Sequence, residues 1–342
     1  MLGGCRNKTC RALVVFIGQG VKMPAINIED TLVLPRLTEP DTAVSRERPV
    51  VKITPGRRGV EGAGFPVYRG FAGLTFADID PFLMLDQLGP VLNGPFETQG
   101  APWHPHRGFE TVTYVIDGEV AHHDSHGGGG VIGSGDTQWM TAGAGVLHDE
   151  MPTERILKEG GWQHGIQLWV NLPSSLKFSP PRYQPLLATE LELATSHDGG
   201  ALVRVIAGEA GGIKGPGSTH TPISIVHVSL APGAQARIPW NRNFNSMIYM
   251  LTGTATVGAE RRVLPAHHVA LLGAGDHIAI QADDTQPTNP WDTGKAEFLL
   301  LGGQPIGEPV VQYGPFVMNT EAEIRQAFED YQAGRLGTIP TN

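Results

Sequence analysis

The sequence predicts an all-β protein built from two tandem barrels of the jelly-roll type, followed by a short C-terminal helix. Glycine, with 45 residues, and proline, with 27, are frequent, and closely spaced turn residues favour short strands over long helices. One strand–turn–strand pattern also occurs twice. Tyr114–Gly118 is echoed by Tyr249–Gly253, and Gly133–Asp136 is echoed by Gly273–Asp276. Two copies of one pattern indicate two domains of related design, each closed so that its sheet leaves few exposed edges.

The chain is long enough for both domains. Its 342 residues allow two units of roughly 150 residues, each with its own hydrophobic core. We expect residues 1–22 to be a disordered extension, residues 23–175 to form the first barrel, and residues 176–342 to form the second barrel and the final helix.

The first 22 residues only weakly resemble a secretion signal. A short apolar run at 12–17 follows three cationic residues, but it is near the lower length limit and no clear cleavage site comes after it. Met23 then begins a segment typical of a cytoplasmic protein, so we expect a cytoplasmic location. The only two cysteines, Cys5 and Cys10, lie in the extension, so disulfides do not stabilise the fold.

Charge and hydropathy exclude two classes of partner. The formal net charge is −9 and no stretch is rich in lysine or arginine, which argues against direct binding to a nucleic-acid backbone. No apolar stretch approaches the roughly 20 residues of a membrane-spanning helix. We therefore expect neither nucleic acid nor membrane as a partner.

In the first half of the chain, runs of β-branched and aromatic residues separated by turn residues predict the strands of the first barrel. Asp117-Gly118 is a tight hairpin turn, and glycines at 127–130 form a loop. The predicted strands are Pro49–Thr54, Asp80–Asp86, Phe109–Ile116, Glu119–Asp124, Thr137–Thr141, Val146–Met151 and Ile166–Leu172.

A helix is predicted close to the C-terminus. Thr320–Glu323 has the form of a capping box, and apolar residues recur with helical spacing from Ile324 to Tyr331. Gly334 ends the pattern. We expect this helix to pack against a barrel and to take no part in chemistry.

Two short motifs carry potential metal ligands. His104 and His106 are two residues apart, so on a strand both imidazoles point to one face. His148 and Glu150 share a face in the same way, and Asp149 turns away. If the two strands are neighbours, three imidazoles and one carboxylate converge. Such a set without thiolate suits iron, manganese, nickel, copper or zinc, and four protein ligands leave coordination positions open for a substrate.

Other residues compete for a place in this site. Glu110 follows His106 by four residues and has the same strand parity, so spacing leaves Glu110 and Glu150 nearly equal as the acidic ligand. His164 precedes a core strand and is a candidate for lining the substrate pocket, although a loop position is the simpler interpretation. Two pairs of adjacent histidines, His122-His123 and His267-His268, are interpreted as ordinary strand residues.

The second half lacks the metal motif. The segment before its repeated strand, Pro239–Asn245, has no His-x-His, and no second ligand lies two residues from His277. We therefore expect no metal of this kind in the second barrel.

Longer strings strongly resemble the pirin family of the cupin superfamily. They are Gly100–Tyr114, Gly135–Gly143, Gln167–Pro173 and Pro315–Thr320, and the resemblance runs from about residue 45 to the C-terminus. It implies two cupin barrels with one metal ion, usually Fe(II), in the first barrel only.

The resemblance also implies the ligands, which are His104, His106, His148 and Glu150, so it favours Glu150 over Glu110. One departure is Asp149, where pirins commonly have serine; because this side chain faces away, we expect it to change only the charge around the site.

Two functions follow as expectations. Several pirins resemble quercetin 2,3-dioxygenases, which implies a flavonol and O2 as substrates, ring cleavage with release of carbon monoxide, and Glu150 as both ligand and catalytic base. The alternative is a regulatory protein whose metal senses redox state and controls the binding of a protein partner, since some animal members are nuclear transcriptional cofactors. A third reading is a metal that only stabilises the fold.

Overall fold

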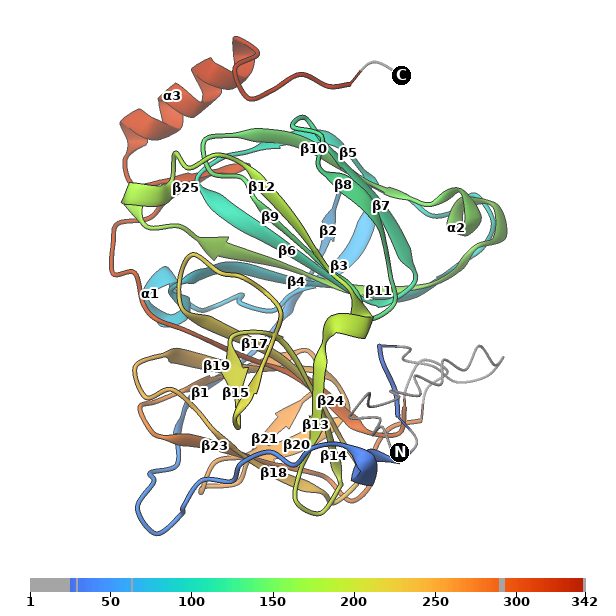
Figure 1. Cartoon of the computed structure of the whole chain (residues 1–342), viewed down its shortest axis with the longest axis vertical. Helices are drawn as coiled ribbons and strands as arrows, with labels where there is room; N and C mark the ends of the chain where they lie inside the picture. Colours follow the sequence, from blue (N-terminus) through green and yellow to red (C-terminus); the bar gives the residue numbers. More distant parts are fainter. Residues whose placement is uncertain (1–24, 29, 63, 289–292, 341–342) are drawn as a thin grey trace, which may run out of the picture.

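The computed structural model describes residues 25–28, 30–62, 64–288 and 293–340. The extension expected at residues 1–22 therefore lies outside the described residues. Two β-barrels are stacked one above the other along the long axis of the molecule (Figure 1). The prediction of an all-β protein with two barrels and a C-terminal helix is confirmed. In the described part of the chain, no helix has the length and apolar character that crossing a membrane demands.

The first barrel consists of a seven-stranded and a four-stranded sheet. In spatial order the larger sheet comprises β12 (Arg182–Leu186), β9 (Thr137–Thr141), β6 (Phe109–Asp117), β11 (Gly161–Asn171), β4 (Phe82–Asn93), β3 (Phe65–Arg69) and β2 (Arg57–Glu61). The smaller sheet comprises β5 (Ala101–His106), β10 (Val146–Pro152), β7 (Glu119–Asp124) and β8 (Gly129–Gly133).

The second barrel repeats this design with a seven-stranded and a four-stranded sheet. Its larger sheet comprises β1 (Val50–Pro55), β22 (His268–Leu272), β19 (Asn245–Thr252), β24 (Ala296–Gly303), β17 (Ile223–Leu230), β14 (Ala201–Ala207) and β13 (Glu192–Thr195). Its smaller sheet comprises β18 (Gln235–Pro239), β23 (His277–Ala282), β20 (Thr254–Val257) and β21 (Arg262–Pro265).

Short elements complete the described fold. Two small hairpins pair β15 (Glu209–Ala210) with β16 (Ile213–Lys214) and β25 (Val311–Tyr313) with β26 (Phe316–Met318). The helices are α1 (Phe76–Ile79), α2 (Glu154–Glu159) and α3 (Glu321–Gln332), with short 3-10 turns at Thr31–Val33, Ser174–Leu176 and Ala188–Glu190.

The two larger sheets share one hydrophobic core. Because side chains alternate along a strand, β6 turns Val112 and Tyr114 toward the second barrel and Thr113 toward the interior of the first. Tyr249 and Leu299 from the second barrel belong to the same buried cluster. The barrels therefore pack face to face through their larger sheets.

The barrels exchange strands, so the boundary predicted at residues 175 and 176 does not separate them. Strand β1, predicted as the first strand of the first barrel, instead pairs with β22 of the second. Strand β12, which follows that boundary, pairs with β9 of the first barrel. Each added strand covers an edge that would otherwise present unpaired backbone groups. A contiguous division of the chain could not anticipate this.

The C-terminal helix α3 has the predicted capping box, in which Thr320 accepts a hydrogen bond from the Glu323 amide. Its buried Ile324 and Ala327 pack in a cluster that Leu147 of β10 also joins. The helix therefore lies over the first barrel, at the opposite end of the molecule from the second (Figure 1). The last part of the chain thus supports the first barrel and not the one that precedes it.

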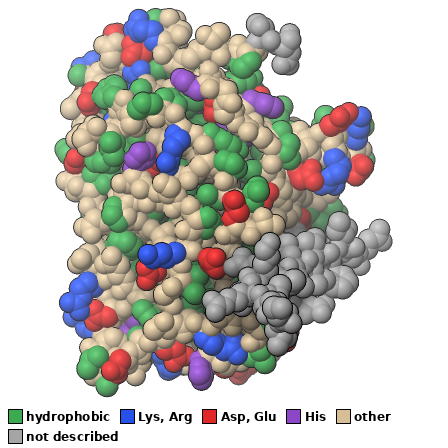
Figure 2. Space-filling view, in the orientation of Figure 1, with side chains coloured by type: hydrophobic (Ala, Val, Ile, Leu, Met, Phe, Trp, Pro, Cys, Tyr) green, Lys and Arg blue, Asp and Glu red, His purple; other side chains and the backbone are tan. Residues whose placement is uncertain are grey.

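Acidic and basic side chains are interspersed on the surface. The face drawn in Figure 2 shows lysine and arginine scattered among acidic and uncharged residues, with no continuous cationic stripe. This distribution agrees with the absence of basic runs in the sequence.

Candidate metal centre

Three of the predicted ligands meet on two neighbouring strands. His104 and His106 lie on β5, and His148 lies on β10, where it is directly opposite His104 in the antiparallel register. The centroid of the His104 ring is 4.8 Å from that of His106 and 4.2 Å from that of His148. One ring nitrogen from each histidine falls within 4.8 Å of the other two. The alternation argument from sequence therefore places these imidazoles together.

Backbone contacts orient the first two rings. The Nδ1 atom of His104 lies 2.8 Å from the carbonyl oxygen of Pro102, and that of His106 lies 3.2 Å from the carbonyl oxygen of Pro315. A carbonyl only accepts hydrogen bonds, so each Nδ1 carries the proton and each Nε2 keeps its lone pair. Nitrogen lone pairs fixed in this way by a backbone acceptor are typical of metal-ligating histidines.

His148 provides the test of whether the residues fit a metal. Its side chain is fully buried, and its Nε2 atom has no hydrogen-bond partner. Buried polar atoms normally have a partner, so an orphaned nitrogen beside two other imidazoles fits a ligand to a cation. We conclude that the donor set is suited to one divalent metal ion.

Burial keeps His106 and His148 neutral. It lowers the pKa of His106 to about 3, with a further contribution from the neighbouring His104. Burial also lowers the pKa of His148 well below its usual value, and both His106 and His104 add to this effect. Neutral imidazole is the form that binds a metal, so the site does not need to release protons from these rings when an ion enters.

Glu150 is separated from the three histidines by an irregularity in the pairing of β10 with β5. The register between β10 and β5 shifts between His148 and Glu150. The ligand atoms of Glu150, His148 and His122 lie within 4.8 Å of one another, whereas the cluster that contains His104 and His106 does not include Glu150. Its Oε1 atom accepts hydrogen bonds from Thr113 Oγ1, at 2.8 Å, and from the Gln138 amide. The four predicted ligands thus form two overlapping groups that share His148.

His122 is the member of the second group that the sequence interpretation missed. It is fully buried on β7, its Nδ1 atom is 3.4 Å from Nδ1 of His148, and its ring stacks on Tyr183. The adjacent His123 is 61% exposed and pairs with Asp149. The alternation of adjacent strand residues already implied that one of the two faces inward, and this was the available signal.

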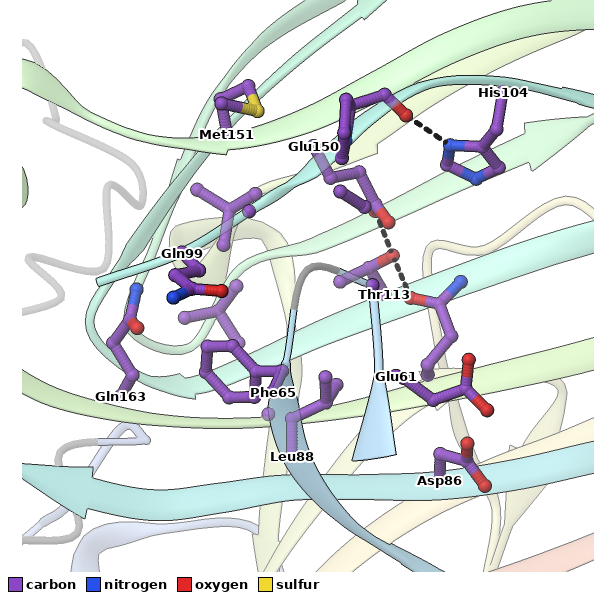
Figure 3. Close-up of a pocket in the computed structure, with 18 of the residues that line it drawn as sticks. Glu61, Phe65, Asp86, Leu88, Gln99, His104, Thr113, Glu150, Met151 and Gln163 are labelled. Atoms are coloured by element: carbon purple, nitrogen blue, oxygen red, sulfur yellow. Dashed lines mark hydrogen bonds between the residues drawn. The ribbon is translucent and has the colours of Figure 1, made fainter. Parts of the chain in front are cut away.

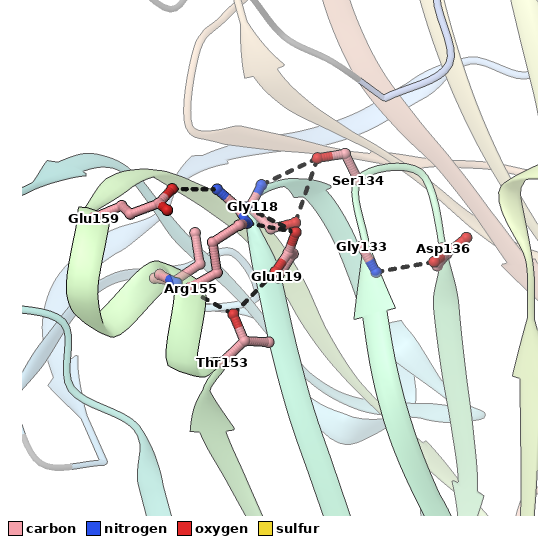
Figure 4. A network of polar contacts seen from close by, with 9 residues as sticks. Gly118, Glu119, Gly133, Ser134, Asp136, Thr153, Arg155 and Glu159 are labelled. Carbon is pink, nitrogen blue, oxygen red and sulfur yellow. Dashed lines mark hydrogen bonds and ion pairs between the residues drawn. The ribbon is translucent and has the colours of Figure 1, made fainter. Parts of the chain in front are cut away.

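A polar network holds the chain just beyond Glu150. Thr153 caps α2 and donates a hydrogen bond to Glu119 of β7 at 2.9 Å, and Arg155 forms an ion pair with the same carboxylate (Figure 4). Because α2 follows β10 directly, this network fixes the end of the strand that carries His148 and Glu150.

Three of the four predicted ligands border a cavity of about 750 Å³ inside the first barrel. His104, His106 and Glu150 are on its wall, and Thr113 lies below Glu150 (Figure 3). Apolar side chains supply much of the remaining wall, namely Phe65, Met84, Leu88, Trp103, Val115, Met151 and Trp169. The volume is within the range of pockets that bind small organic molecules.

The structure separates the two predicted pocket residues. His164 lies on β11 and not in a loop; it borders the cavity, but its Nε2 accepts a hydrogen bond from Gln87 at 2.9 Å. Glu110 does not border the cavity: it is fully buried, accepts a hydrogen bond from Thr141 and lies 4.0 Å from His220. Strand parity does not carry over from His106 to Glu110, because the chain turns between them and enters the other sheet.

The fold is a bicupin, because two β-barrels are stacked on each other. Among the described residues, only the first barrel has a histidine–carboxylate cluster that could hold a metal ion. Two family models match, the pirin domain at residues 64–170 and the pirin C-terminal cupin domain at residues 225–337. The chain belongs to the pirin family.

Similar proteins agree with this assignment. The chain is 42% identical to a pirin-like protein of Solanum lycopersicum, over 86% of this chain and 94% of the relative. It is 43% identical to a putative quercetin 2,3-dioxygenase of Pseudomonas aeruginosa, over 80% of this chain and 93% of the relative. The crystal structure of a quercetin 2,3-dioxygenase from Acinetobacter baumannii matches with a TM-score of 0.79 and 37% identity, covering 86% of this chain and all of the other.

Proposed function

We propose that this pirin is an iron(II) protein that cleaves flavonols with O2, in the manner of a quercetin 2,3-dioxygenase. The observation that carries the proposal is the grouping of three imidazoles and one carboxylate beside a cavity of about 750 Å³ with largely apolar walls. Similarity to proteins named as quercetin 2,3-dioxygenases supports the choice of substrate.

His104, His106, His148 and Glu150 would hold the ion. A bound divalent metal lowers the pKa of a hydroxyl that it ligates and activates the substrate toward O2. Glu150 takes the proton of the flavonol 3-hydroxyl. Thr113 and Gln138 bind Oε1 of this carboxylate and so keep it oriented toward the cavity.

The apolar wall positions the flat rings and excludes water. Trp169 and Phe65 offer aromatic surfaces for the flavonol rings. In the overall reaction both atoms of O2 enter a ring-opened ester, and the ring carbon that bore the 3-hydroxyl leaves as carbon monoxide. Exclusion of water protects the reactive substrate anion from side reactions.

The test is a turnover measurement on protein loaded anaerobically with Fe(II). On exposure to air we expect loss of quercetin absorbance, with one O2 consumed and one carbon monoxide released for each flavonol. If protein in molar excess leaves quercetin unchanged while binding one metal ion per chain, the dioxygenase proposal fails and the regulatory alternative takes its place.

A matched pair of variants assigns the acidic ligand. Glu150→Gln should lower the rate of turnover by about 10²–10⁴-fold, the range for loss of a general base. Glu110→Gln keeps an oxygen that can accept from Thr141 and should leave turnover close to that of the wild type. The reverse order of effects would identify Glu110 as the acidic ligand.

A further inference from the structure

A row of polar side chains crosses the larger sheet of the first barrel on its cavity face. Gln138 of β9 is opposite Thr113 of β6, Thr113 is opposite Gln167 of β11, and Gln167 is opposite Asp86 of β4. Arg69 of β3 is next to Asp86 in the same register. Of this row, Thr113 lies under Glu150, and Asp86 lies further from Glu150 and His104 on the cavity wall (Figure 3).

Most members of this row have partners. Thr113 contacts both Glu150 and Gln167 at 2.8 Å, and Gln138 donates to Thr113 at 3.1 Å. At the other end, the Arg69 guanidinium binds Glu61 of β2. The Thr113 hydroxyl has one proton and so donates to Glu150 or to Gln167, and polar contacts extend from Glu150 to Gln167.

Asp86 is the exception. The residue is 1% exposed, and neither carboxyl oxygen has a hydrogen-bond partner. The residues two positions away on the same strand, Met84 and Leu88, flank it on the cavity wall. Buried polar groups without a partner are rare and costly. A carboxyl group placed between two apolar side chains and left unpaired therefore indicates that its partner is a ligand.

We propose that Asp86 is a specificity-determining residue that binds a phenolic hydroxyl of an aromatic substrate, at the end of the cavity away from the metal ligands. This inference rests on the proposed function and names the second point at which the cavity recognises its substrate. The metal ligands take the 3-hydroxyl, and Asp86 takes a hydroxyl on an outer ring.

The surroundings of Asp86 favour a phenol over a cation. Burial raises the pKa of its carboxyl group to about 7; Arg69 on β3 opposes this shift and Glu61 on β2 adds to it. A carboxyl group that is protonated for part of the time both donates and accepts hydrogen bonds, as a phenol does. An ammonium group would instead require a full negative charge and would compete with Arg69. The aromatic and apolar neighbours on the wall suit the ring that carries the hydroxyl.

The experiment compares two flavonols. Quercetin carries hydroxyls on its outer rings, whereas 3-hydroxyflavone keeps the metal-binding 3-hydroxyl and 4-carbonyl but has no outer hydroxyl. Binding is measured by calorimetry on protein loaded with Zn(II), which has no redox chemistry and so prevents turnover. The variants are Asp86→Leu and Asp86→Asn, and Asp284→Asn, in an exposed loop of the second barrel, is the control for loss of one carboxylate.

We expect the wild type and Asp284→Asn to bind quercetin at least tenfold more tightly than 3-hydroxyflavone, which corresponds to about 1.4 kcal/mol. In Asp86→Leu the ratio should fall to about one, through weaker quercetin binding alone, and Asp86→Asn should lie between. The measured quantity is the ratio of the two flavonol affinities within one variant. A partly folded preparation binds less of both flavonols and therefore does not change this ratio.

Two outcomes overturn the inference. One is a wild type that does not discriminate between the two flavonols, including one that binds neither. The other is an Asp86→Leu variant that retains the wild-type ratio. The proposed function fails separately, if Fe(II)-loaded wild type shows Asp86-dependent binding of quercetin but consumes no O2; that result would support the role of Asp86.

Discussion

At the scale of single residues, His148 is the point on which the centre depends. It belongs to both groups of potential ligands, and its Nδ1 atom lies beside His122 while its Nε2 atom has no partner. If Nε2 binds the metal, Nδ1 must carry the proton and donate it to Nδ1 of His122. His122 then fixes the tautomer and the orientation of His148 without binding the ion itself.

This role predicts the effect of removing His122. Loss of a residue that orients a ligand typically costs about 10–100-fold in metal affinity, so His122→Ala should weaken metal binding by that amount. The neighbouring His123 offers a matched control, because it is 61% exposed and faces away. Competition with a metal chelator measures both affinities, and equal values for His122→Ala and His123→Ala would exclude the orienting role.

The raised pKa of Asp86 predicts that the free energy of unfolding depends on pH. Burial raises its pKa to about 7 in the folded chain, against an ordinary value of 3.8. Between these limits the unfolded chain releases a proton that the folded chain retains, so the contribution of Asp86 to the free energy of unfolding falls as the pH rises from 4 to 7. The difference should reach about 4 kcal/mol, at 1.36 kcal/mol per pKa unit.

Denaturant titrations of the wild type and Asp86→Asn at several pH values measure this. The wild type should lose stability relative to the variant as the pH rises toward 7, and the difference should then level off. A constant difference across that range would show that the carboxyl group titrates normally and has a partner.

At the scale of elements, the turn after β5 decides which side chains reach the candidate metal centre. Gly108 has a φ of +90°, and a Cβ atom there would lie 2.0 Å from the carbonyl oxygen of Val317. The turn lets the chain leave the smaller sheet after His106 and enter the larger sheet at Phe109. The ligand strand and the segment that leads to the C-terminal helix therefore meet at a position where only glycine fits.

Gly108→Ala should consequently lower the free energy of unfolding by more than the roughly 1 kcal/mol that a left-handed backbone costs alanine. Gly127→Ala is the control, because Gly127 has a similar φ of +82° but nothing within 4 Å of an added Cβ. Chemical denaturation compares the two. Equal losses would mean that the contact with Val317 does not matter.

The strands around the candidate site also show what the sequence could and could not predict. Alternation within one strand placed His104 with His106, because that rule needs only local geometry. The same rule failed for Glu110, because it was continued across Gly108, where the chain changes sheet. For His122 the rule held, but nothing local indicated which of two adjacent histidines was buried. The bulge beside Glu150 is likewise set by the partner strand, which spacing does not show.

At the scale of the whole molecule, the two barrels depend on each other. Each contains a strand from the far side of the predicted boundary, and their larger sheets share one core. The C-terminal segment returns to the first barrel, where Arg107 forms an ion pair with Asp330 and Pro315 faces His106. Pairing between residues so far apart in the chain leaves no local signal, so the sequence predicted two barrels but not their exchange of strands.

This arrangement predicts that the barrels unfold together. Differential scanning calorimetry should give one transition whose calorimetric and van't Hoff enthalpies agree. Saturating metal should raise its midpoint, since the ion binds the folded chain. Two separate transitions, of which metal shifts only one, would show that the shared core and exchanged strands do not couple the barrels.

The central claim is that one metal ion is held by His104, His106, His148 and Glu150, and the most direct test is an anomalous-difference map from crystals grown with Fe(II). We predict one peak per chain, about 2 Å from Nε2 of each histidine and from a carboxylate oxygen of Glu150. A peak bound by His122, His148 and Glu150 without His104 and His106, or no peak in the first barrel, would contradict the account.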